Sequence, residues 1–541
     1  MKKLMLIMCG IAMVTVLNAK PAFRGPINRV QPDGSTITVY MHGDEFFHWE
    51  TNDKGEWLTR DENGKYVKTA ALTDEQITAQ RKASRYYIPQ SLQQAQPTNL
   101  APRGLIILVN FKDVQFQSTN TLDIMRDMHN GDNYTYSYEY NDPYEGTHVS
   151  VTAQGSAKKY FVDQSGGRYQ PYFDVVGPYT VSQDMAYYGK NDSYGNDKNP
   201  HVMVKEACEL AHNDGVNFAQ YDNDKNGYVD FVYVIYAGYG EADGGAANTI
   251  WPHSWNIYTK GGISLKLDGK QVDLYACSSE LNYYSKKRAG IATFCHEFSH
   301  VLGLPDLYST NGASHKTSGS WDVMDYGPYN NDGNTPPSYS GYERLFFGWT
   351  TGRVPNAPLN MTIKELQEFN DVCVITSTGS FNDQGNDPNP TEFYIIENRQ
   401  QKGWDQYLPG HGMILTKVKY SYDYWTNNKV NNNSSDMRVD IIEADGLKPS
   451  YNQNKPDNGY MGKPGDAFPA GATSYSGITD YPITDITETD GVIHFKVKGG
   501  GPEGIETLNT DEKNAARKVF ENGHVLIIRD GVKYSLLGEK L

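Results

Sequence analysis

The sequence predicts a central α+β domain that is flanked by two β-rich regions. Helix and strand patterns alternate between residues 101 and 352. Short strand patterns separated by turn residues instead fill residues 20–100 and 353–500. A chain of 541 residues is long enough for roughly three or four domains of ordinary size. We therefore expect three folded units, preceded by a leader over residues 1–19 and followed by a linker and tail over residues 501–541.

Composition excludes two classes of protein. The chain carries 49 Lys and Arg residues against 65 Asp and Glu residues, which gives a formal charge of −16. Nucleic-acid binding needs a basic surface that neutralises phosphates, so we expect no nucleic-acid partner. Outside the N-terminus, no apolar run approaches the roughly 18 residues needed to cross a bilayer. We therefore expect no integral membrane span in the mature chain.

The first residues have the pattern of a secretory signal peptide. Lys2 and Lys3 precede an apolar stretch over residues 4–17, and small residues follow. We expect cleavage after Ala19 and a secreted or cell-surface protein; the alternative, an uncleaved membrane anchor, suits the short stretch less well. Export permits disulfide bonds, and several pairings are open to the remaining cysteines, which are Cys208, Cys277, Cys295 and Cys373.

The first folded unit covers residues 20–100. Turn residues at regular spacing and a strand pattern over residues 36–40 predict a small, hairpin-rich module. A Gln-rich, Pro-containing stretch at its end, residues 90–102, is typical of a linker. The apolar run over residues 105–111 then predicts a buried strand that opens the central domain.

Within the central domain, residues 202–212 have a helical pattern and residues 228–236 a strand pattern, followed by a Gly-rich loop over residues 238–245. The next region is predicted to be an all-β, sandwich-like domain, with strands over residues 372–376, 393–397, 413–418, 439–443 and 492–497. After a glycine-rich hinge, strands over residues 525–529 and 532–536 flank Asp530-Gly531, a pair that favours a tight hairpin turn.

The strongest functional signal is the segment from Thr293 to Asp306, which contains His296-Glu297-Phe298-Ser299-His300. On a helix, His296 and His300 lie one turn apart on the same face, close enough for both rings to bind one zinc ion. The opposite face is apolar and includes Cys295, which we expect to be a packed thiol. The alternative is an ordinary amphipathic helix with a solvated polar face, but the residues that follow at fixed offsets argue against a chance match.

The neighbouring residues complete a hydrolytic site. Glu297 stands beside a ligand, where it is predicted to act as general base toward a water activated by zinc. Catalytic zinc needs a third protein ligand and an open fourth position. Gly303 turns the chain out of the helix, so we expect Asp306 to return toward the metal as that third ligand. This is the chemistry of peptide-bond hydrolysis, and we therefore expect protein or peptide substrates.

The segment from His296 to Asp306 resembles the zinc signature of the metzincin peptidases, with Asp where most members have a third His, a variant of the immune inhibitor A family. Residues 320–327 resemble the Met-turn of that clan. The resemblance implies a metzincin-like catalytic domain over residues 101–352, with Met324 as an apolar floor below the zinc. It also implies that Tyr326 stabilises the oxyanion as a second catalytic residue. Ordinary core packing is the alternative for Met324. Further resemblance lies in residues 103–113, 222–238, 397–399 and 408–412.

A second metal site is predicted in the segment from Asp222 to Asp230. It matches the first nine positions of an EF-hand calcium loop, with Gly227 at the turn, but the twelfth position is Tyr233 instead of Glu. We expect a structural calcium site; the alternative is an Asp- and Asn-rich turn. The expected calcium ligands are the side chains of Asp222, Asp224, Asn226 and Asp230 and the carbonyl of Tyr228.

The position of residues 20–100 suits a prodomain that covers the cleft until export is complete. This module has no cysteine to block a zinc ion. His42, Asp44 and Glu45 are therefore candidates to reach the metal, with ordinary surface or loop roles as the alternative. Arg103-Gly104 is a candidate processing site.

The last predictions from the sequence concern the C-terminal tail and the overall function. Residues 527–534 resemble C-terminal sorting tails of exported Bacteroidota proteins, which implies contact with a type IX secretion machinery; a small packed β module is the alternative. The leading hypothesis is a secreted zinc endopeptidase made as a zymogen. The alternative is a calcium-stabilised surface adhesin or carbohydrate-binding protein with a relic zinc site, in which aromatic residues 420–425 stack on sugars.

Overall fold

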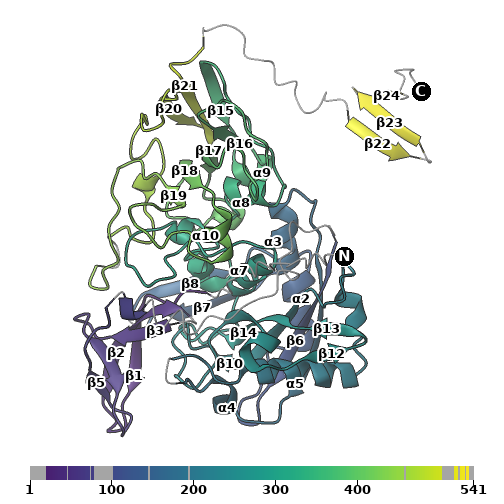
Figure 1. Cartoon of the computed structure of the whole chain (residues 1–541), viewed down its shortest axis with the longest axis vertical. Coiled ribbons are helices and arrows are strands. Elements are labelled where there is room, and N and C mark those ends of the chain that lie inside the picture. Colours follow the sequence, from purple (N-terminus) through teal and green to yellow (C-terminus); the bar gives the residue numbers. More distant parts are fainter. Residues whose placement is uncertain are drawn as a thin grey trace, which may run out of the picture.

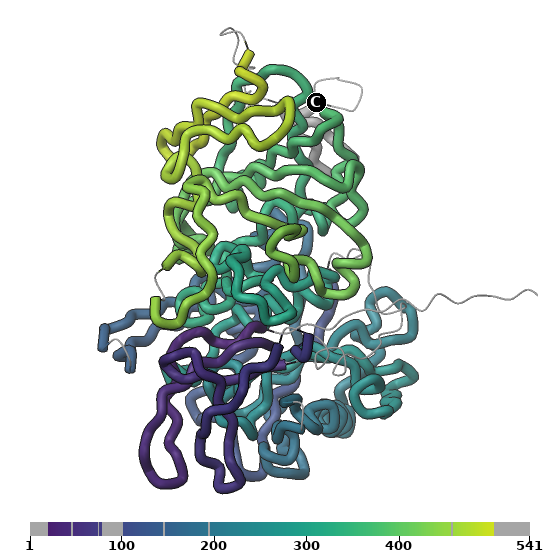
Figure 2. The backbone as a smooth tube through the Cα atoms, turned by 60° about the vertical axis from the view of Figure 1, so that its left-hand side comes forward, coloured from purple at the N-terminus to yellow at the C-terminus, as the bar shows by residue number. Residues whose placement is uncertain are grey.

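A computed structural model of the chain describes residues 20–44, 47–73, 75–77, 101–143, 146–192, 195–455 and 458–501, together with three short strands between residues 517 and 534. Figure 1 shows a small N-terminal sheet, a central domain of sheet and helices, and a C-terminal region of β-sheets. The tube in Figure 2 shows the N-terminal strands lying against the central domain. Within the described ranges, no helix is both long and apolar enough to cross a membrane.

The central domain is built on a five-stranded mixed sheet with the order β11-β14-β10-β6-β9. Four strands are parallel to their neighbours, and the edge strand β11 is antiparallel to β14. The strand predicted to open the domain is confirmed as β6, whereas the one predicted over residues 228–236 begins only at Val232, because a polar loop precedes it. The strands are β6 (Arg103–Asn110), β9 (Tyr172–Thr180), β10 (Val232–Tyr239), β11 (His253–Asn256) and β14 (Leu274–Leu281).

Both faces of this sheet are covered, which accounts for the continuous apolar run of β6. Ile106 and Leu108 point into one core, and the alternate residues Leu105 and Ile107 point into the other. The first core holds α2 (Leu122–Asn130), α3 (Ala157–Gln164) and α7 (Ala292–Val301). The second holds α4 (Met185–Gly189) and α5 (Pro200–Asn213), which confirms the helix predicted over residues 202–212.

Short elements complete the central domain. They are the hairpins β7 (Ser137–Asn141) with β8 (His148–Thr152) and β12 (Leu265–Leu267) with β13 (Lys270–Val272), the helix α6 (Ile257–Gly261), and the 3₁₀ helices η2 (Phe218–Tyr221), η3 (Gly319–Trp321) and η4 (Gly327–Gly333).

The N-terminal module is an antiparallel meander, as its turn spacing predicted. Its strands pair in chain order and are β1 (Pro26–Val30), β2 (Thr36–Asp44), β3 (Phe47–Thr51), β4 (Trp57–Arg60) and β5 (Tyr66–Lys68). Ile27 and Met41 form a small core with Ala242 and Trp251 of the central domain. The Arg29 side chain donates to the carbonyls of Gly244 and Gly245 at 2.6 and 2.7 Å. The module is therefore joined to the central domain by apolar and polar contacts.

The C-terminal region has two antiparallel sheets, of four and three strands. Their facing residues, including Cys373, Ile396, Leu415 and Phe495, form one core. This agrees with the sandwich-like expectation, although the strands β15 and β20 were not predicted. The strands are β15 (Leu359–Ile363), β16 (Val372–Ile375), β17 (Glu392–Arg399), β18 (Gly412–Lys419), β19 (Val439–Ile441), β20 (Ile483–Thr489) and β21 (Val492–Val497). The helical turns of this region are α9 (Leu366–Phe369), α10 (Tyr422–Thr426), η5 (Gly403–Asp405) and η6 (Pro464–Asp466), and α8 (Gly341–Phe346) precedes it at the end of the central domain.

The boundary predicted near residue 353 is not a break in packing. Val374 and Ile395, on the second face of the four-stranded sheet, belong to the same apolar core as Tyr342 of α8 and Phe298 of α7. The C-terminal sheet therefore has the sandwich core on one face and the helices of the central domain on the other. This position explains the continuous apolar pattern of β16 and of residues 393–396 in β17.

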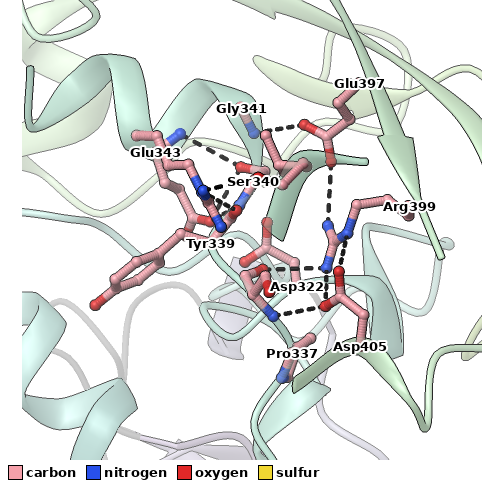
Figure 3. Close-up of polar contacts among 12 residues, drawn as sticks. Asp322, Pro337, Tyr339, Ser340, Gly341, Glu343, Glu397, Arg399 and Asp405 are labelled. Atoms are coloured by element: carbon pink, nitrogen blue, oxygen red, sulfur yellow. Dashed lines mark hydrogen bonds and ion pairs between the residues drawn. The ribbon is translucent and has the colours of Figure 1, made fainter. Parts of the chain in front are cut away.

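A buried network of charged side chains connects the central domain to the C-terminal β region (Figure 3). Arg399 of β17 donates to both Asp405 oxygens at 2.9 and 2.7 Å and to Glu397 at 3.1 Å, and the side chains of all three are almost fully buried. Arg399 also donates to the Ser338 carbonyl at 3.1 Å, and the other Glu397 oxygen accepts from the Gly341 amide at the start of α8. Through Glu397, the Arg399 guanidinium thus connects the β-sheet to the first turn of a central-domain helix.

The cysteines and the tail complete the comparison with the sequence. Cys208, Cys277, Cys295 and Cys373 are buried and free, so none of the possible disulfides forms among them. Cys295 of α7 points into the core, which confirms it as a packed thiol.

The tail forms a three-stranded antiparallel sheet of β22 (Arg517–Glu521), β23 (His524–Arg529) and β24 (Val532–Tyr534). The predicted turn at Asp530-Gly531, the signal peptide and Glu45 lie outside the described residues.

We predict that Arg399→Met lowers the free energy of unfolding by about 3–5 kcal/mol, because two buried carboxylates lose their cation. The measurement is chemical unfolding of the full chain. Arg353→Met is the control, since Arg353 pairs with Asp371 on a largely exposed surface and should cost about 1 kcal/mol or less. Equal losses in the two variants would contradict a supporting role for the Arg399 network.

Candidate metal centre

The two histidines of the motif are placed by helix α7, whose apolar residues Phe294 and Phe298 pack into the core under the central sheet. The imidazoles of His296 and His300 lie on the other side, with ring centroids 4.7 Å apart. Gly303 has a φ of 103°, which only glycine adopts without strain, and it turns the chain back after the helix. Asp306 then returns to the histidines, as the sequence predicted.

Three potential ligand atoms converge at one point. His296 Nε2 and His300 Nε2 are 3.1 Å apart, and Asp306 Oδ1 lies 3.3 and 3.4 Å from them. Ligand atoms about 2.1 Å from a tetrahedral zinc ion are about 3.4 Å from one another. The three atoms therefore fit a shared tetrahedral zinc ion, and His296, His300 and Asp306 form one of the groups able to hold a metal within the described ranges.

The remaining ring nitrogens are already engaged, which fixes the orientation of both imidazoles. His296 Nδ1 is 2.8 Å from the Val323 carbonyl, and His300 Nδ1 is 2.8 Å from the Leu304 carbonyl. A carbonyl can only accept a hydrogen bond, so each Nδ1 carries the proton and each Nε2 keeps its lone pair directed toward the centre. This is the tautomer that a metal ligand requires.

Asp306 is held by a residue that no pattern in the sequence indicates. The Asn428 side chain donates to Asp306 Oδ2 at 2.6 Å and accepts from the Asp306 amide at 2.8 Å. Asn428 is buried and lies 122 positions further along the chain, just after α10 of the C-terminal region. No local pattern links two residues so far apart. The C-terminal region thus contributes directly to the position of the third candidate ligand.

The charges at the centre are consistent with metal binding. Burial raises the pKa of Asp306, but the two neighbouring imidazoles lower it more, to about 2. Burial dominates at Glu297, the predicted base, and raises its pKa to about 8. Glu297 Oε2 accepts no hydrogen bond within the described part of the chain. A fully buried carboxylate with an unused oxygen, next to a cluster of ligand atoms, is suited to take up a proton.

The predicted Met-turn forms the base of the centre. Met324 is fully buried, its amide bonds to Asp322 Oδ1 at 2.8 Å, and its carbonyl accepts from the Leu307 amide. The preceding residue, Val323, supplies the carbonyl that orients His296. The turn is therefore fixed to both sides of the metal-ligand segment. Tyr326 is also buried, with its hydroxyl 2.7 Å from Arg24 Nε of the N-terminal module.

The first described residues of the chain occupy this cleft. The backbone nitrogen of Lys20 donates to Glu297 Oε1 at 3.0 Å, and the Lys20 side chain reaches Asp243 at 2.7 Å. Arg24 lies 4.5 Å from the centre of the Tyr451 ring and bonds to Tyr326. Lys20 and Arg24 line a cavity of about 710 Å³ together with residues of the central and C-terminal regions.

These contacts differ from those expected of the N-terminal module. His42 is buried against Trp49, and its ring nitrogens contact Arg24 and Thr51, so it supports Arg24 instead of reaching the metal centre. Asp44 accepts from the amide of Phe47 inside its own hairpin. One feature of the sequence could have pointed to Lys20. The predicted cleavage of the signal peptide after Ala19 would make Lys20 the first residue of the exported chain.

The candidate processing site is also placed differently from the expectation. Arg103 and Gly104 are the first residues of β6 and pair with Tyr172 and Phe173 of β9. The Arg103 side chain forms a bidentate pair with Asp174. Proteases cut extended, accessible segments, so a bond inside a hydrogen-bonded strand is a poor substrate. The structure therefore disfavours processing between these two residues.

The predicted calcium ligands form a turn before β10. Ligand atoms of Asp222, Asp224 and Asp230 lie within 4.8 Å of one another. Gly227 has a φ of 95° and donates its amide to Asp222. Burial, with a smaller effect of the neighbouring carboxylates, raises the pKa of Asp230 to about 6. A strand, not a helix, follows, and the Lys270 ammonium lies 2.6 Å from Asp222 Oδ2, so a cation is already present at one carboxylate.

The aromatic segment of the alternative hypothesis packs inward. Trp425 is buried in the main core, where it contacts Tyr342, and Tyr420 packs beside it with ring centroids 4.8 Å apart. Only Tyr422 of this segment is largely exposed among the large apolar side chains. One isolated exposed ring does not form a platform for a sugar.

Comparison with known proteins gives one matching family model, described as the immune inhibitor A peptidase M6 catalytic domain, over residues 93–353. Immune inhibitor A of Bacillus thuringiensis subsp. alesti is 28% identical over 284 residues, which are 46% of this chain and 40% of that protein. The pre-pro-metalloprotease PrtV of Vibrio cholerae serotype O1 (strain M66-2) is 28% identical over 216 residues, which are 35% of this chain and 23% of that protein. The matches thus span well under half the length of either relative.

Proposed function

Residues 93–353 belong to the immune inhibitor A peptidase M6 family, and we propose that the chain is a secreted, zinc-dependent endopeptidase made as a zymogen. The observation that carries the proposal is the convergence of His296 Nε2, His300 Nε2 and Asp306 Oδ1 within 3.4 Å, beside the buried carboxylate of Glu297. These residues would hold the zinc ion with one position left for a water or substrate. We also propose that α7, the loop from Gly303 to Asp306 and the Met-turn around Met324 form a metzincin-like arrangement.

The proposed mechanism assigns a task to each side chain. Zinc, when bound, polarises the substrate carbonyl and lowers the pKa of water. Glu297 takes a proton from the attacking water and delivers it to the nitrogen of the departing amine. Tyr326 donates a hydrogen bond to the carbonyl oxygen as negative charge develops on it. Met324 keeps the floor below the ligands apolar and excludes water from it.

Latency is proposed because the N-terminal segment holds both groups that the mechanism needs. The Lys20 nitrogen bonds to Glu297, and Arg24 bonds to the hydroxyl of Tyr326. The ring of Tyr451 and the imidazole of His42 hold Arg24 in place. A peptide substrate cannot reach the base or the proposed oxyanion donor while these contacts persist. Removal of the segment would open the cleft.

We predict that Glu297→Gln keeps zinc but loses peptide hydrolysis, because the amide still fills the site and cannot accept the proton. Asp306→Ala should lose both, because one of three ligands is missing. Metal analysis and caseinolysis of the purified protein measure these outcomes. Glu139→Gln, which alters an exposed carboxylate on β7, is the matched control and should keep full zinc content and activity. Hydrolysis that survives Glu297→Gln would contradict the mechanism.

The zymogen proposal predicts that Arg24→Ala raises the caseinolytic activity of the full chain about tenfold or more, since a half-buried charged anchor of the segment and its hydrogen bond to Tyr326 are lost. Activity is measured before any truncation of the chain, as checked by N-terminal sequencing. Arg60→Ala is the control, because Arg60 bonds to Tyr66 within the N-terminal module and does not face the cleft. An Arg24→Ala chain as inactive as the parent would count against latency by cleft occupation.

We also propose that the turn from Asp222 to Asp230 binds a structural calcium ion. The three clustered carboxylates and the left-handed Gly227 support the proposal, and Lys270 would withdraw from Asp222 when calcium enters. Because the ion binds only the folded chain, it should raise the melting temperature. The effect should disappear in Asp224→Asn and persist in Asp123→Asn, which alters an exposed carboxylate on α2. Equal melting temperatures with excess calcium and with a calcium-selective chelator would refute this site.

Export is the last part of the proposal. The signal peptide pattern, the name of the Vibrio relative as a pre-pro-metalloprotease and the cleft occupation by Lys20 all suit a protein that is secreted before it becomes active. The three-stranded tail would then contact the secretion machinery, in line with its resemblance to sorting tails. The substrates would be extracellular proteins or peptides.

A further inference from the structure

The basic side chain of Lys20 lies in a buried pocket of the cleft. Lys20 Nζ lies 2.7 Å from Asp243 Oδ1 and 3.9 Å from the centre of the Tyr329 ring, and the two charged side chains are only 4% and 9% exposed. A buried carboxylate is costly unless a cation neutralises it. Asp243 belongs to the loop after β10, on the wall of the cavity that Lys20 enters. The wall therefore presents a negative charge to whatever side chain occupies this position.

The position of this pocket relative to the reaction follows from the Lys20 backbone. Its nitrogen is 3.0 Å from Glu297 Oε1. In the proposed mechanism Glu297 hands its proton to the nitrogen of the departing amine, so a nitrogen at this oxygen marks the place of that amine. Lys20 thus occupies the position of the residue directly C-terminal to the bond that is cut. Its side chain marks the pocket for that residue.

The backbone contacts of the segment would be available to any peptide. The Lys20 carbonyl accepts from Trp251 Nε1 at 3.3 Å, and the Pro21 carbonyl accepts from the Tyr329 hydroxyl at 2.7 Å. The Phe23 amide donates to the Ala242 carbonyl at 2.9 Å. These groups bind the main chain, which is the same in every peptide. At the Lys20 position, the contacts that depend on the identity of the residue are those of its side chain with Asp243 and with the Tyr329 ring.

We infer that Asp243 is a specificity-determining residue, and that the enzyme prefers peptide bonds followed directly by Lys or Arg. This inference rests on the proposed peptidase function and names its substrate class. The carboxylate pairs with the ammonium or guanidinium of that residue, and the Tyr329 ring adds a cation–π contact. An acidic residue at the same place would meet a buried like charge and be rejected. The N-terminal segment then blocks the cleft by presenting the side chain that the cleft binds best.

The test maps cleavage sites in a mixed peptide library by mass spectrometry, with the secreted full chain and its maturation products. The parent enzyme should cut before Lys or Arg at least about tenfold more often than before Leu or Met. Asp243→Asn should reduce this ratio about tenfold, and Asp243→Lys should turn the preference toward Asp and Glu. Asp142→Asn is the matched control, because Asp142 lines the same cavity but accepts a hydrogen bond from the Tyr284 hydroxyl; it should keep the parental ratio.

A second comparison separates specificity from simple anchoring of the segment. Lys20→Glu removes the cation from the segment but leaves Asp243 in the wall, so the cleavage preference for Lys and Arg should remain unchanged while latency weakens. If the parent and the Lys20→Glu chain hydrolyse peptides without a basic preference, the inference about Asp243 is wrong and the peptidase function stands. If no variant hydrolyses peptides although each contains zinc, the proposed function itself fails.

Discussion

The structure depends on holding two imidazoles and one carboxylate around a common point inside the protein. Each of these groups loses hydration on burial, and each has rotamers that would direct its ligand atom elsewhere. Three outer contacts remove that freedom: the carbonyl of Val323, the carbonyl of Leu304 and the side chain of Asn428. They come from the Met-turn, from the loop after α7 and from the C-terminal region. The centre is therefore the meeting point of segments that are far apart in the chain.

The C-terminal β region is best understood through that requirement. Its four-stranded sheet covers the helices of the catalytic domain, and its loop after α10 supplies Asn428. Arg399 joins β17 to the start of α8 through buried carboxylates whose charges it compensates. Removing these charged groups from water costs free energy. The network therefore contributes mainly by fixing one arrangement of the two regions. The Met-turn, which packs between them, is held in the same arrangement.

Local patterns in the sequence were enough to predict much of this arrangement. Helical spacing placed His296 and His300 on one face, and Gly303 indicated the turn that returns Asp306 to them. A continuous apolar run located β6, and strand patterns between turn residues located all four strands of the sheet β16-β17-β18-β19, whereas β9, β11 and β14 of the central sheet were not predicted. What could not be predicted are contacts between segments without a shared pattern, such as Asn428 with Asp306 or Lys20 with Glu297. The start of β10 was predicted too early because the polar calcium-type loop before it also contains the aromatic and branched residues Tyr228, Val229 and Phe231.

The continuity of the main core has a consequence for how this chain can be divided. The family match stops at residue 353, yet Val374 and Ile395 beyond it share a core with Phe298 of α7. A fragment that ended at residue 353 would expose to solvent the apolar surface that Val374 and Ile395 cover. Such a fragment would be prone to self-association. Recombination that exchanged everything after this point would have to replace both a matching apolar surface and an amide for Asp306. The two regions therefore depend on each other for folding.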